Sequence, residues 1–193
     1  MNKKAIIMTT VSVLMVLSVG VVYAAFSDKG KYTGSSFNVA SADIKILNDV
    51  ALGIVASNLV EEKPGPTFNN VSPSWASDYP IKIYNNATST LTITSNAYYE
   101  TINDPDELRS YIYCEILEWN DANTNGTVET GELGTSLGNK TLLKWKTEGI
   151  TIGNINQGEV KGYILRFTTT STFPLTKQGK SGLFDFEFTS VGQ

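Results

Sequence analysis

The sequence contains no histidine and only one cysteine, Cys114. Without histidine there is no Ser-His-Asp or Cys-His catalysis and no HExxH zinc site. A lone cysteine cannot close an internal disulfide, so the fold must be stable without that cross-link. The alternating residues around Cys114 predict a buried thiol in a strand. No carboxylate pair stands out, so a carboxylate hydrolase is kept only as an alternative, and we expect a protein that is not an enzyme.

Positive charge is also scarce. The chain of 193 residues has a formal net charge of −4, and its lysines are scattered. Nucleic-acid binding needs a basic patch that neutralises phosphates. The composition therefore argues against nucleic acid as a partner.

The first 24 residues are typical of an export signal. Lys3 and Lys4 precede an uncharged, mostly apolar run over 5–22, and small residues follow at Ala24 and Ala25. This order is the one that a signal peptidase recognises. An uncleaved membrane anchor is the alternative, although the run is near the lower length limit for a spanning helix. Cleavage after Ala24 would leave 25–193 as a secreted or cell-surface domain that meets the membrane only during export.

Long helical periodicity is missing, and short alternating runs recur instead. Alternation is the mark of half-buried strands. In the clearest run, Phe184, Phe186 and Phe188 share one face, and Asp185 and Glu187 share the other. Several short strands separated by turn residues predict an all-β sandwich of one domain. The runs lie at 37–39, 44–46, 81–83, 91–99, 111–119, 163–167 and 184–188.

Other segments are less distinct. Asp104 and Pro105 could cap and begin a short helix. The segment 51–62 fits either a strand or a short helix, and 142–146 is equally undecided. Turn signals such as Pro64-Gly65-Pro66 and Gly153-Asn154 separate the predicted strands.

The segment 121–132 matches the calcium-loop pattern D-x-[DN]-x-[DN]-G-x5-E. Oxygens at the first, third and fifth positions converge because Gly126 allows a sharp turn. The flanks do not read as helices, so this would be a calcium loop outside an EF-hand, with a structural role. A polar turn that binds nothing is the alternative. The predicted ligands are Asp121, Asn123, Asn125, Thr127 through its carbonyl, Glu129 and Glu132.

Four N-x-[ST] sequons begin at Asn70, Asn86, Asn125 and Asn139. In an exported protein they permit N-glycosylation, which the sequence alone does not establish. A glycan on Asn125 would compete with the predicted cation.

The start of the predicted mature chain resembles a known family. The segments 23–28, Tyr-Ala-Ala-Phe-Ser-Asp, and 34–46, Gly-Ser-Ser-Phe-Asn-Val-Ala-Ser-Ala-Asp-Ile-Lys-Ile, are similar to the TasA/camelysin family of exported proteins with SipW-type signals. Looser similarity covers 69–73, 80–94 and 183–188. Ala42 and Ser74 depart from the family pattern, which has glycine at both places.

The resemblance implies a jelly-roll-like β-sandwich. It also implies a secreted subunit of a biofilm-matrix or cell-surface fibre, a homopolymer in which the freed N-terminal segment of one copy adds a strand to the next. Here that candidate donor strand is 25–32, with Phe26 as its apolar anchor. Other matrix or surface proteins are further candidate partners. Camelysins have been described as metalloproteases, but this chain has no histidine that could bind a catalytic metal in that way. The alternative is a monomeric exported module that binds a surface glycan or protein with calcium.

Overall fold

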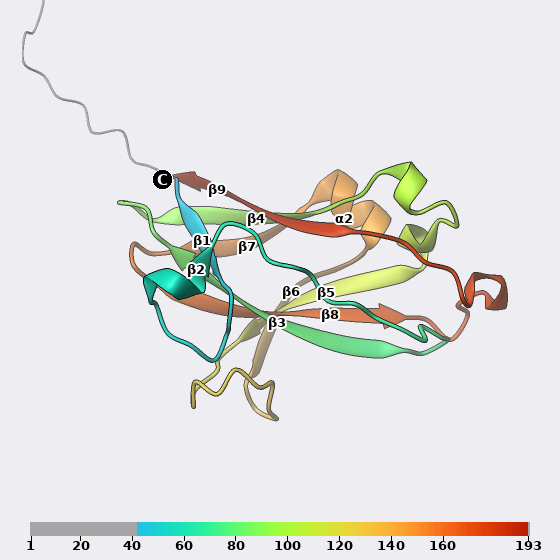
Figure 1. Ribbon diagram of the computed structural model, residues 1–193, viewed down its shortest axis with the longest axis horizontal. Coiled ribbons are helices and arrows are strands. Elements are labelled where there is room, and N and C mark those ends of the chain that lie inside the picture. Colours follow the sequence, from blue (N-terminus) through green and yellow to red (C-terminus); the bar gives the residue numbers. More distant parts are fainter. Residues whose placement is uncertain (1–41, 193) are drawn as a thin grey trace, which may run out of the picture. The chain divides into compact units, whose positions relative to one another are not determined.

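The computed structural model describes residues 42–192, and the fold reported below refers to these residues (Figure 1). The predicted signal peptide 1–24, the candidate donor strand 25–32 and the alternating run at 37–39 lie outside them. The described residues belong to one compact unit.

Two antiparallel sheets pack face to face, which confirms the predicted all-β sandwich (Figure 1). The chain passes repeatedly from one sheet to the other, as a jelly-roll-like sandwich requires. The six-stranded sheet has the order β2 (Leu59–Val60), β1 (Ile44–Leu47), β3 (Ala76–Asn85), β8 (Val160–Thr169), β5 (Ile112–Trp119) and β6 (Leu133–Thr141). The three-stranded sheet has the order β7 (Ile150–Ile155), β4 (Leu91–Tyr98) and β9 (Asp185–Gly192).

The main core lies between the sheets and follows the predicted alternation. Ile81 and Ile83 of β3 and Leu91 and Ile93 of β4 are all buried within it. Cys114 of β5 is fully buried, and this burial raises the pKa of its thiol. The prediction of a buried strand cysteine is therefore confirmed.

The undecided segment 142–146 is helical. Helix α2 (Leu142–Glu148) is capped by the Thr141 hydroxyl, which accepts a hydrogen bond from the Lys144 backbone N–H. Such a cap satisfies one of the free N–H groups of a helix start. The helix buries Trp145, whose Nε1 donates to the Ser95 carbonyl at 2.9 Å. Helix α2 thereby covers one end of the core.

The prediction of a short helix that begins at Asp104 is wrong. The chain instead forms two 3-10 turns, η2 (Thr101–Asn103) and η3 (Leu108–Ser110). Glu107, between them, has a φ of 56°, in the left-handed region, which a right-handed helix does not allow. The Asp104 carboxylate still acts as a cap, because it accepts from the N–H groups of Leu108 and Arg109.

One predicted turn lies inside a strand, and the undecided segment 51–62 contains both a 3-10 turn and a short strand. The predicted turn at Gly153-Asn154 is a bulge inside β7, where Gly153 has a φ of 101°. The segment 51–62 contains the 3-10 turn η1 (Ala56–Asn58) before β2. The buried Asn58 side chain holds the loop before it, donating to the Asp49 carbonyl at 2.9 Å. A further 3-10 turn, η4 (Leu175–Lys177), follows β8.

Candidate functional sites: a polar loop and an apolar groove

The loop 121–132 joins β5 to β6 and has the turn that its sequence predicts. The Asp121 carboxylate accepts from the N–H groups of Asn125 at 3.1 Å and Gly126 at 3.0 Å. Asn123 Oδ1 also accepts from Asn125 N, and Asn125 Oδ1 accepts from Thr127 N. Gly126 has a φ of 74°, which favours glycine. The first, third and fifth side chains of the pattern therefore converge on one turn.

The acidic end of the loop is arranged differently. Glu129 accepts from the side-chain amides of Asn123 at 3.0 Å and Asn125 at 2.8 Å, so it joins the turn. Glu132 instead accepts from Trp119 Nε1 and from the Glu129 N–H, both at 3.1 Å. Between residues 42 and 192 no three Asp, Glu, Cys or His side chains are grouped closely enough to hold a metal ion.

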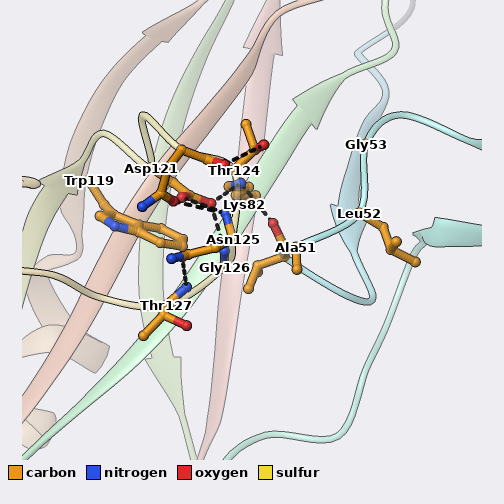
Figure 2. Close-up of polar contacts among 12 residues, drawn as sticks. Ala51, Leu52, Gly53, Lys82, Trp119, Asp121, Thr124, Asn125, Gly126 and Thr127 are labelled. Carbon is orange, nitrogen blue, oxygen red and sulfur yellow. Dashed lines mark hydrogen bonds and ion pairs between the residues drawn. The ribbon is translucent and has the colours of Figure 1, made fainter.

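A lysine that the sequence analysis did not single out lies at the centre of this site (Figure 2). Lys82 of β3 places its Nζ 2.8 Å from Asp121 Oδ2 and 2.7 Å from the Val50 carbonyl oxygen. The same Nζ lies 5.1 Å from the centre of the Trp119 ring. The side chains of Lys82 and Asp121 are only 12% and 1% exposed. The pair is therefore a buried ion pair that ties the loop to the segment after β1.

The pKa of Asp121 reflects this setting. Burial opposes ionisation of the carboxyl, but hydrogen bonds from Lys82, Gly126 and Asn125 outweigh that effect and lower its pKa. The carboxylate is thus ionised at neutral pH and already has a cationic partner. A calcium ion at Asp121 would have to displace the Lys82 ammonium, with oxygens of Asn123, Asn125 and Glu129 close by. The donor set fits such an ion in part, because Glu132 is turned to Trp119.

The loop also covers a small apolar cluster on the outer face of the six-stranded sheet. Leu117, Trp119 and Ile164 form its buried part, and Val50 and Val128 pack against them. The loop approaches the segment after β1 so closely that a Cβ on Gly126 would lie 2.8 Å from Ala51. The sequence hint for Lys82 was its place between Ile81 and Ile83, which directs a strand residue to the outer face.

A second feature is an apolar groove between the two sheets, at one side of the sandwich. Its volume is about 570 Å³, and it lies between β9 of the small sheet and β1 and β3 of the large one. Ile44, Ile46, Ile81, Ile83, Leu165, Phe184, Phe186 and Phe188 form its apolar lining.

Among residues 42–192, burial shows that the sandwich is incomplete on the side of β9. The inward residues of β4, including Leu91 and Ile93, are completely buried, and Ile150 and Ile152 of β7 are at most 5% exposed. On β9, by contrast, Phe186 and Phe188 are only half-buried. The described residues form six strands in the large sheet and three in the small one. Among these residues, no strand lies opposite the inner face of β1 to cover it fully.

The open edge of β9 borders this groove. Within residues 42–192, β9 pairs with β4 and with no other strand. The segment after β2, coloured teal in Figure 1, runs along the gap and lines the groove with Pro64, Gly65 and Pro66. Because proline has no backbone N–H, this segment is poorly suited to act as a strand.

Comparison with known proteins adds no assignment. No protein-family model matches the chain, and no curated protein matches its sequence. Among residues 42–192, no helix has the length and apolar character needed to cross a membrane.

Proposed function

We propose that the protein is an exported structural subunit that builds a fibre of the extracellular matrix or cell surface by donor-strand exchange. The observation that carries the proposal is the incomplete side of the sandwich. Phe184, just before β9, and Phe186 and Phe188 within it stay half-buried over an apolar groove. They lie beside a strand edge that has no partner among residues 42–192. Such an edge is a template for strand addition.

The proposed donor is segment 25–32 of another copy. It has eight residues, and β9 also has eight, so one strand of about 26 Å can run along the whole edge. In an extended strand Phe26 and Tyr32 project to the same face, toward the groove. Each backbone hydrogen bond would stabilise the joint by about 1 kcal/mol net. A newly buried aromatic ring would add roughly 1.5–3 kcal/mol. Together they oppose the loss of conformational entropy when the segment becomes ordered.

The position at which the described chain begins is relevant to where the proposed donor segment would leave the sandwich. The Asp43 carbonyl accepts from Asn86 N, and Gly192 pairs with Leu91, so the start of β1 and the end of β9 lie at the same end of the sandwich (Figure 1). A segment that leaves from this end can reach a neighbouring copy, and a head-to-tail contact of this kind propagates into a filament. Pairing with β9 of the same molecule is the competing arrangement.

Electron microscopy and sedimentation of the mature chain test the proposal. We expect filaments from the chain that begins at Ala25. We expect monomers when 25–32 is replaced by a Gly/Ser segment of equal length, which keeps the chain length as a control. A native chain that stays monomeric at high concentration, with or without calcium, would contradict the fibre and favour the monomeric binding module. Filaments from the replaced chain would exclude 25–32 as the donor.

We also propose that loop 121–132 binds calcium as a structural ion of modest affinity. The convergence of Asp121, Asn123 and Asn125 around Gly126 supports this role. Affinities of roughly 10⁻⁴–10⁻³ M suit extracellular sites. Millimolar calcium should raise the Tm of the native protein and raise that of a Lys82→Met variant further, because the competing ammonium is gone. An equal Tm with calcium and with chelator, in both proteins, would reject the site.

A further inference from the structure

The solvent face of β9 carries two carboxylates that form no ion pair within residues 42–192. Asp185 and Glu187 are exposed and alternate with the phenylalanines that line the groove. Their direct partners on β4 are the uncharged residues Tyr98 and Asn96. Neither carboxylate has an ion pair with any residue between 42 and 192. A basic strand added at the open edge of β9 would supply the direct counter-charge that these residues do not.

The candidate donor segment has a matching charge pattern. Residues 25–32 read Ala-Phe-Ser-Asp-Lys-Gly-Lys-Tyr. If Phe26 and Tyr32 face the groove, Lys29 and Lys31 must face solvent, because side chains alternate along a strand. The two lysines then have the same face and the same two-residue spacing as Asp185 and Glu187. Directly opposed unlike charges stabilise a strand pair, and like charges destabilise it.

The groove offers a partner for the remaining charge of the segment. In the proposed strand, Asp28 would share the inward face with Phe26 and Tyr32. Lys63 lines the groove, and its Nζ donates to the Asn48 carbonyl at 2.9 Å without a carboxylate within ion-pair distance among residues 42–192. The inward and outward charges of the segment are thus both complementary to the site.

We infer that Asp185 and Glu187 select the incoming strand and its register by pairing with Lys29 and Lys31 of a second copy of this chain. This inference rests on the proposed donor-strand assembly. A slip of one residue would turn both lysines into the apolar groove and both aromatic rings to solvent. The charge pairs and the apolar contacts therefore favour the same register, and a donor strand with acidic residues at the lysine positions is rejected.

Charge reversal on each side, alone and together, tests the inference in the full mature chain. The acceptor variant is Asp185→Lys/Glu187→Lys, and the donor variant is Lys29→Glu/Lys31→Glu. Each should raise the concentration needed for filament growth by roughly tenfold or more, because two attractive pairs become repulsive. The combined variant should return to within about twofold of the native chain. Added salt should weaken the native joint and strengthen both single-sided variants.

A control reversal keeps the net charge equal to that of the acceptor variant. Glu100→Lys/Glu118→Lys changes two exposed carboxylates outside the groove and should leave growth unchanged. Urea unfolding checks that every variant is folded. One contrary result is filaments that depend on 25–32 but do not respond to either single-sided reversal. Another is a combined variant that is not rescued. Either result shows that the inference is wrong, while the donor-strand proposal stands. If the native chain forms no filaments, both are wrong.

Discussion

Lys82 and Asp121 are separated by a large stretch of chain and meet as a buried ion pair, with 2.8 Å between Nζ and Oδ2. The lysine comes from the middle of β3, and the aspartate begins the loop after β5. The ammonium also binds the Val50 carbonyl, so one side chain holds two loops together over the outer apolar cluster.

Removing this lysine should destabilise the fold. Lys82→Met leaves the Asp121 carboxylate, 1% exposed, without its cation. Breaking one side of a buried pair typically costs about 3 kcal/mol of unfolding free energy. Lys144→Met, at an exposed position, is the control and should change stability by less than about 0.5 kcal/mol. Urea unfolding measures both, and equal effects would show that the pair contributes little.

The same pair makes stability depend on acid. The folded state lowers the pKa of Asp121 from its ordinary value of 3.8. The contribution of Asp121 to the unfolding free energy is therefore complete above this ordinary pKa. It is lost as the pH falls through the lower pKa of Asp121 in the folded protein. The gap in unfolding free energy between the native protein and Asp121→Asn should be widest near neutral pH and shrink below pH 3.8. Carboxylates elsewhere cancel in this difference. A constant gap down to low pH would contradict the assignment.

The close approach of the two loops at Gly126 should not tolerate a methyl group. Gly126 and Gly131 both have positive φ, at 74° and 96°, but a Cβ at Gly131 would meet nothing within 4 Å. Gly131→Ala should lose about 1 kcal/mol through backbone strain alone. Gly126→Ala should lose about 3 kcal/mol, because the Cβ also collides with Ala51. Thermal or urea unfolding of the two variants separates the cost of backbone strain, present in both, from the cost of the steric collision, present only in Gly126→Ala.

The inner face of β9 is held by an aromatic stack. Phe186 stacks on Trp145 with ring centres 5.1 Å apart and planes inclined by 20°. Phe186→Ala should lower the unfolding free energy by about 2–3 kcal/mol, less than for a fully buried ring. Val191→Ala on the same strand, where the side chain is 70% exposed, should change it by less than about 0.5 kcal/mol. Similar losses in both variants would mean that β9 contributes only through its backbone.

The strands were the predictable part of the fold, because each exposes one face and buries the other. Ile81 and Ile83 of β3, and Phe186 and Phe188 of β9, follow the period of two that the sequence shows. Strand β6 and the bulged strand β7 were not expected. The burial pattern of β6 does not alternate, so its sequence lacks the strand signal. Gly153 resembles a turn residue although it sits in a bulge.

The candidate sites were predictable only where the information is local. The turn at Gly126 follows from its own segment, since Asp121 and Asn123 accept from backbone groups a few residues away. The role of Lys82 could not be predicted, because it depends on the meeting of segments that are distant along the chain. The open edge of β9 depends on the pairing of the nine strands within residues 42–192 and has no local signal.

Strand β9 comes last in sequence among the described strands, and its edge forms one wall of the groove. If the chain is exported from its N-terminus, as proposed, segment 25–32 crosses before β9, so an emerging molecule could offer a donor strand before it could receive one. Under the proposed assembly, a copy truncated before Asp185 would dock onto a growing fibre and leave no place for the next subunit. Such fragments would act as terminators of growth, and fibre length would then report on the integrity of the secreted chains.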